Sequence, residues 1–139
     1  MAFIDKTDIT RYLDESTLDQ LTDNTDSLVD EAILDAEDRV REIIQARYDI
    51  DAEFAKTTTN RNRSLLKHTI NIAIYYLFQR LYTNVLPEGR IEAFEEAETW
   101  CKDVYSGKLM VNLDKNDEPN EQGWPLRWGS NTKKGSQDW

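Results

Sequence analysis

The feature that most restricts the fold of this chain is an apolar segment between residues 64 and 82. Its large side chains would point in nearly every direction around a helix axis, and a helix that is apolar on all sides is normally buried. We therefore predict a central helix, capped at its start by Ser64 or Asn62. A chain of 139 residues has few ways to cover such a helix, so we expect another subunit to cover part of it. The apolar side chains are Leu65, Leu66, Ile70, Ile72, Ala73, Ile74, Tyr75, Tyr76, Leu77, Phe78, Leu81 and Tyr82.

Two amphipathic helices are predicted before and after this segment. Between Ser27 and Tyr48, apolar residues recur every three or four positions, which is the spacing of one helix face, and Ser27-x-x-Asp30 matches a capping pattern. The other helix has Pro87 at its first turn and Gly107 after its end, a common arrangement. The two inner stripes are Val29, Ala32, Ile33, Ala36, Val40, Ile43 and Ile44, and Ile91, Phe94, Ala97, Trp100, Cys101, Val104 and Tyr105.

The other segments are short or polar. Residues 7–13 and 16–21 each begin with a group that can cap a helix, and we predict two short helical turns there. Residues 49–63 lack periodicity and are predicted as a loop, whereas residues 109–113 alternate enough for one short strand. The predicted fold is all-α: a small helical bundle in residues 1–113, followed by an extended C-terminal tail in residues 114–139, which is too polar to form a core.

The net charge of -10 is concentrated in the first part of the chain. Residues 1–56 hold 16 Asp and Glu against 6 Lys and Arg, whereas residues 57–139 hold 11 of each kind. Binding to nucleic acid requires a basic surface that neutralises phosphates, so independent DNA binding is not expected. A role close to DNA would instead depend on repulsion between like charges.

No catalytic, metal or cofactor site is predicted. His68 is the sole histidine and is interpreted as structural, because no nucleophile lies at a known spacing from it. Carboxylate pairs such as Asp35 with Asp38 are interpreted as a solvated helix face, and residues 114–118 lack the glycine and glutamate offsets of a calcium loop. Cys101 is the single cysteine and is predicted to be a core residue in a protein of a reducing compartment.

No export signal or membrane span is predicted. The sequence contains no run of about 20 apolar residues, and residues 1–5 lack the basic start of a signal peptide. We therefore expect the protein to stay in the cytoplasm in which it is made, without a membrane partner.

The tail contains the candidate partner-binding residues. Tryptophan and arginine are the commonest residues at the energetic centres of interfaces, and tryptophans left in water lose the benefit of burial. Two interpretations stay open: the tail aromatics fold back onto the helices of their own chain, or they dock on a neighbouring protein. The candidates for docking on a neighbouring protein or subunit are Trp124, Leu126, Arg127, Trp128 and Trp139.

The order of these segments resembles the small head-tail connector (adaptor) proteins of tailed bacteriophages, of the Mu-like and related head-completion type. The resemblance covers about residues 7–109 and depends on the order and spacing of several segments together. The segments are Ile9-Thr10-Arg11-Tyr12, residues 18–23, residues 29–36, Ala46-Arg47-Tyr48-Asp49, residues 72–77, and the stretch from Ala97-x-x-Trp100 to Ser106-Gly107-Lys108.

The resemblance implies a helical bundle that assembles as a ring, commonly of twelve copies, beneath the portal of the phage head. It implies that the C-terminal segment points to the portal, that a tail-side or stopper protein binds the opposite face, and that DNA passes through without specific binding. The protein would then be located at the head-tail junction of the virion. A different class of function is an acidic regulatory protein that mimics DNA and occupies a nucleic-acid-binding enzyme; it would need carboxylates spaced like phosphates on one continuous face.

Overall fold

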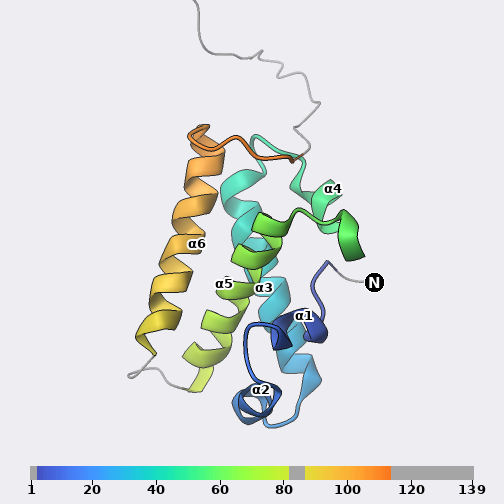
Figure 1. Cartoon of the computed structure of the whole chain (residues 1–139), viewed down its shortest axis with the longest axis vertical. Coiled ribbons are helices and arrows are strands. Elements are labelled where there is room, and N and C mark those ends of the chain that lie inside the picture. Colours follow the sequence, from blue (N-terminus) through green and yellow to red (C-terminus); the bar gives the residue numbers. More distant parts are fainter. Residues whose placement is uncertain (1–2, 82–86, 114–139) are drawn as a thin grey trace, which may run out of the picture.

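A computed structural model of the chain describes residues 3–81 and 87–113. Within them the protein contains α-helices only, apart from one 3-10 turn, which confirms the all-α prediction. Figure 1 shows α5 in front of α3, α6 beside them, and α1 and α2 at one end of the bundle. The elements are α1 (Lys6–Thr10), α2 (Glu15–Thr22), α3 (Asp26–Ile44), α4 (Ile50–Phe54), the 3-10 turn η1 (Thr58–Asn60), α5 (Arg63–Leu81) and α6 (Glu88–Ser106).

Helix α5 is the buried centre of the bundle, as its apolar circumference predicts. Ile70, Ile72, Ile74 and Leu77 are each 0% exposed within a single chain. Cover by another subunit stays a prediction for the half-buried Leu66, Tyr75 and Tyr76, whereas the single chain itself covers these four residues. The cover comes from α3 and α6 together with α1 and α2, two short helices that pack on α5 and bring residues such as Ile9 and Leu18 into the core.

The start of α5 confirms one of the two predicted caps. The side-chain oxygen of Asn62 accepts a hydrogen bond from the backbone N–H of Leu65 at 3.0 Å, so Asn62 and not Ser64 is the cap. At the start of α3 the predicted Ser27-x-x-Asp30 cap is wrong. Helix α3 already begins at Asp26, because two residues in the left-handed region, Asp23 (φ 54°) and Asn24 (φ 60°), end α2 and turn the chain early.

The predicted loop at residues 49–63 contains two helical turns that periodicity did not reveal. The carboxylate of Asp49 accepts a hydrogen bond from the N–H of Ala52 at 3.2 Å and caps α4, a helix of only 5 residues. Ile50 and Phe54 are its buried pair, and the Phe54 ring meets Phe3 edge-on at 5.0 Å between ring centres. One pair of apolar residues four apart is too short a signal to distinguish a helical turn from a loop.

Helix α6 lies between Pro87 and Gly107, as predicted, and Gly107 has a φ of +89°. The strand predicted at residues 109–113 is wrong, because this segment has no strand beside it in the described part of the chain. Its alternation is nevertheless present: Val111 and Leu113 pack toward the core, whereas Met110 is 99% exposed. The segment crosses the end of the bundle (Figure 1).

Candidate assembly surfaces

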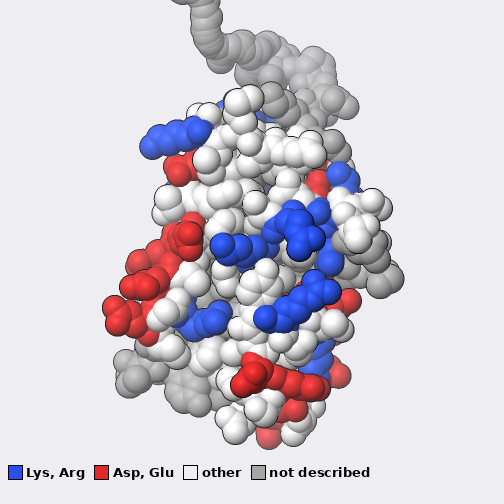
Figure 2. Space-filling model, viewed as in Figure 1, with Lys and Arg blue, Asp and Glu red and all other residues white. Residues whose placement is uncertain are grey.

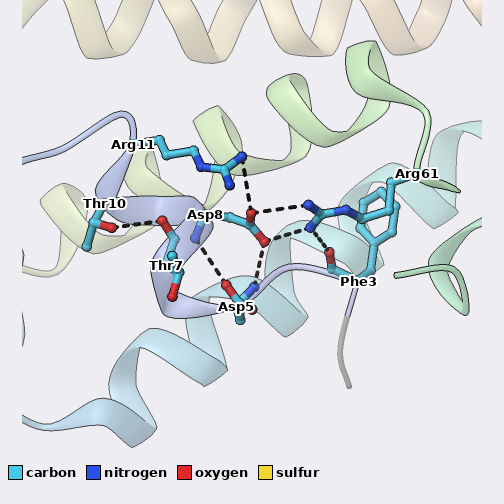
Figure 3. A network of polar contacts seen from close by, with 7 residues as sticks. All are labelled: Phe3, Asp5, Thr7, Asp8, Thr10, Arg11 and Arg61. Atoms are coloured by element: carbon cyan, nitrogen blue, oxygen red, sulfur yellow. Dashed lines mark hydrogen bonds and ion pairs between the residues drawn. The ribbon is translucent and has the colours of Figure 1, made fainter. Parts of the chain in front are cut away.

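A buried ion pair fixes the first helix to the chain segment that precedes α5 (Figure 3). The Arg61 guanidinium donates to both carboxylate oxygens of Asp8, at 2.7 Å and 3.3 Å, and also to the backbone carbonyl of Phe3 at 2.7 Å. Burial is the largest single influence and opposes ionisation of Asp8, but the hydrogen bonds from Arg61 and from the Asp5 N–H, together with the charges of Arg61 and Arg11, outweigh it, so the pKa of this carboxyl is lowered. Asp8 also accepts from the N–H of Asp5, which completes a capping box on α1.

Next to this ion pair is a groove of about 460 Å³, which we call the cationic groove. Its lining includes three arginines, two carboxylates and two larger apolar side chains, namely Arg11, Arg61, Arg63, Asp5, Asp8, Tyr12 and Leu66, so the cations are in excess. Exposed Lys67 follows Arg63 by four residues and therefore lies one turn along the same side of α5. Figure 2 shows lysine and arginine side chains gathered across the middle of this side of the molecule. A protein with a net charge of -10 thus presents a local positive surface.

The exposed side of α3 carries the opposite charge. Leu34 is 59% exposed there and lies among five carboxylates, a surface that we call the acidic stripe. Two of them are partly neutralised within α3, Asp38 by Arg41 at 2.6 Å and Glu42 by Arg39 at 3.2 Å. The other three carboxylates, Asp30, Glu31 and Asp35, have no ion-pair partner among the described residues. The carboxylates of the acidic stripe are Asp30, Glu31, Asp35, Asp38 and Glu42.

The acidic stripe and the cationic groove lie on different sides of the molecule. The residues of α3 that face the core are Val29, Ile33, Val40 and Ile44, and helix geometry puts the exposed Leu34 and its neighbours on the opposite side of the same helix. Helix α3 lies behind α5 in Figure 1, whereas the groove includes α5 residues and the α1 end of the bundle. The stripe therefore points away from the groove.

A third charged surface runs along α6. Glu88, Glu92, Glu95 and Glu96 are all exposed, and their spacing places them on one side of the helix. We call this surface the glutamate stripe, and Figure 2 shows its acidic side chains at the left edge of the view. Glu98 is not part of the glutamate stripe, because it forms an ion pair with Arg39 of α3 at 2.5 Å. The hydrogen bond from Arg39 lowers the pKa of the Glu98 carboxyl.

His68 belongs to the core, in agreement with its structural interpretation. It is 6% exposed and its ring stacks on Trp100 at 4.8 Å between ring centres, at the base of a pocket of about 350 Å³. Burial and the nearby Lys67 ammonium lower the pKa of His68, so its ring is neutral at physiological pH. Its Nδ1 has no hydrogen-bond partner among the described residues, and neither a cysteine nor a serine lines the pocket.

Two further titratable groups are buried. Cys101 is 0% exposed, which confirms the prediction of a core cysteine, and burial raises the pKa of its thiol to about 12. Glu37 was not singled out by the sequence, yet it is 8% exposed and burial raises its pKa to about 7. The sequence pattern could have indicated that Glu37 is buried, since Glu37 lies four residues after Ile33 and three before Val40 on the buried stripe.

The described part of the chain contains no cluster of three or more His, Cys, Asp or Glu side chains that could hold a metal ion. Within residues 3–81 and 87–113, no helix is long and apolar enough to cross a membrane. The predicted partner-binding residues Trp124, Leu126, Arg127, Trp128 and Trp139 lie outside the described residues, as does the 114–118 segment.

Fold and surfaces together define a small helical-bundle protein with a single core and three charged surfaces on different sides. The model of the family described as bacteriophage Mu, Gp36 matches residues 3–126 of the chain. This chain therefore belongs to the bacteriophage Mu Gp36 family and is a phage protein. A search of curated proteins finds no match to it.

Proposed function

We propose that this protein is a structural head-tail adaptor of a tailed phage. In this proposal it forms a ring below the portal protein, of twelve copies in keeping with the resemblance, joins the capsid to the tail and lets DNA pass. Its partners are further copies of itself, the portal protein and a tail-side or stopper protein. It catalyses no reaction, binds no cofactor, is made in the host cytoplasm and ends at the head-tail junction of the virion.

The observation that carries this proposal is the family match over residues 3–126, which includes the whole described bundle and continues into the tail as far as Leu126. A phage protein of this size with a rigid core and no clustered catalytic groups in its described part is suited to assembly. The surfaces fit the same role, because the exposed glutamates on α6 repel duplex DNA, whereas positive side chains would retain it.

The test is co-sedimentation of the purified protein with DNA-filled heads that carry the portal of the same phage. The full chain is compared with a chain that ends after Leu113, so that the whole bundle is kept and only residues 114–139 are removed. We expect the full chain to bind at one ring per head and the truncated chain to bind less. Failure of both forms to bind would contradict the adaptor proposal and favour the DNA-mimic alternative.

A further inference from the structure

The cationic groove has charges left over after its internal contacts are formed. Arg61 is occupied by Asp8, but Arg63 and Lys67 have no ion-pair partner among the described residues, and Arg11 reaches Asp8 only at 3.8 Å with 63% of its side chain exposed. Arg11 and Arg63 thus line an open groove whose wall includes the apolar side chain of Leu66, and Lys67 lies one turn of α5 beyond Arg63. Such a surface fits a partner that presents carboxylates together with an apolar side chain.

The acidic stripe of the same chain has that composition. Leu34 is 59% exposed in its centre, and Glu31 and Asp35 on either side of it are exposed and unpaired among the described residues. A leucine exposed to this extent leaves most of its apolar side chain in water, so burial against an apolar surface of a partner would be favourable. The groove volume of about 460 Å³ leaves room for one such side chain and its neighbours.

We propose that the cationic groove of one copy receives the acidic stripe of the next copy, with Leu34 entering the groove beside Tyr12 and Leu66. This inference rests on the proposed ring, and it names the two surfaces that form the contact between subunits. Because the stripe and the groove lie on different sides of one molecule, the contact joins copies head to tail. Such a heterologous contact repeats around a ring until it closes.

The geometry favours a second copy over other acidic partners. The groove and the stripe match in sign, and each includes an apolar part, whereas duplex DNA offers phosphates but no side chain for Leu66 to contact. The formal charge of -10 would also make an approach of the whole protein to DNA unfavourable. An acidic segment of the portal protein is the remaining competitor, and the experiment separates it from a second copy.

Cross-linking tests the contact directly. Leu34→Cys places a thiol in the stripe and Thr59→Cys places one in the groove lining; Thr59 is exposed. A short bismaleimide is added to the concentrated full-length protein and, separately, to protein bound to heads. The native Cys101 is 0% exposed with a pKa of about 12, so it contributes no background. We expect a chain with both substitutions to give a ladder of multimers, and a mixture of the two single variants to give dimers.

Each single variant alone is the decisive control. A head-to-tail contact never brings two Leu34→Cys thiols or two Thr59→Cys thiols together, so neither variant alone should cross-link. Dimers from a single variant would show a symmetric contact and overturn the inference. Absence of a ladder both in solution and on heads would overturn it too, whereas one ring per head without any ladder would leave the adaptor proposal intact.

Charge reversal supplies a second readout. Arg63→Glu with Lys67→Glu should weaken self-association at least tenfold, and Glu31→Lys with Asp35→Lys should do the same. Mixing these two double variants should restore self-association with alternating copies, because the reversed groove of one variant meets the reversed stripe of the other and their unchanged groove and stripe also match in charge. Glu92→Lys with Glu95→Lys on α6 is the matched control and should leave self-association unchanged. A groove variant that still self-associates normally but fails to bind heads would assign the groove to the portal and overturn the inference.

Discussion

The Asp8–Arg61 pair offers the sharpest test of how the short N-terminal helix is held on the bundle. The side chains are 5% and 11% exposed, so replacing Asp8 with alanine leaves a buried guanidinium without its counter-charge. Removing one partner of a buried pair typically costs about 3 to 5 kcal/mol. The lower end applies here, because Arg61 keeps its hydrogen bond to the carbonyl of Phe3.

We therefore expect Asp8→Ala to lower the free energy of unfolding by about 3 kcal/mol in urea, which corresponds to about 10 °C in the melting temperature. Arg11→Ala is the matched control, because Arg11 lies 3.8 Å from the same carboxylate but its side chain is 63% exposed. Arg11→Ala should lower the free energy of unfolding by less than about 1 kcal/mol. Equal losses for the two variants would refute the view that burial gives the Arg61 contact its strength.

The same pair predicts a dependence on acid. The folded-state pKa of Asp8 is lowered, so the ionised carboxylate is favoured in the folded protein. Its stabilisation is complete above the ordinary aspartate pKa of about 4 and is lost as the pH falls through the lower folded value. Asp8→Asn keeps the shape but not the charge, and should remove this part of the acid sensitivity. An unchanged acid profile in Asp8→Asn would assign the sensitivity to other carboxylates.

Three further changes have defined outcomes. Glu37→Gln should stabilise the protein by about 2 to 3 kcal/mol at pH 8 and change little at pH 4, measured by urea unfolding, because the raised pKa of about 7 disfavours the charged carboxylate in the folded state. Gly107→Ala should lower the free energy of unfolding by about 1 to 2 kcal/mol, since φ is +89° and an added Cβ would lie 3.0 Å from the Arg47 guanidinium. If the left-handed backbone is the cause, Gly107→Asn should lower the free energy of unfolding by less than Gly107→Ala, because asparagine adopts this conformation more readily than alanine. Trp128→Ala should reduce co-sedimentation with heads while the circular dichroism spectrum of the helices stays unchanged, and equal binding by mutant and parent would contradict the docking role of the tail.

The sequence predicts the parts of this fold that repeat locally. The apolar circumference of α5, the stripe of α3 and the Pro87-to-Gly107 frame of α6 each extend over several turns, so periodicity identifies them. The 5-residue helix α4 is too short for that signal, whereas the short helices α1 and α2 were predicted from residues that can cap a helix. The start of α3 depends on the left-handed Asp23 and Asn24. Sequence spacing also cannot predict the Asp8–Arg61 pair, because its partners are 53 residues apart.

The sequence indicated the acidic surface but not the cationic groove. The excess of carboxylates in residues 1–56 was evident, and Leu34 could have been recognised as an apolar residue off the buried stripe of its helix. The cationic groove was hidden, because its lining comes from α1 and from residues 59–70, which are adjacent only in the folded chain. Counting charges along the sequence gives a net of zero for residues 57–139 and so misses a local positive surface.

The three charged surfaces have different roles in the proposed ring. If the acidic stripe of α3 meets the groove of the next copy, its carboxylates are neutralised between subunits and no longer face the channel. The glutamate stripe of α6 lies to the side of the α3-to-α5 direction along which copies would be joined (Figure 1), so it is free of that contact. Its four glutamates would then line the passage and repel the phosphates of DNA. A reversal of charge at Glu92 and Glu95 should accordingly leave the ring intact and act only on the movement of DNA through it.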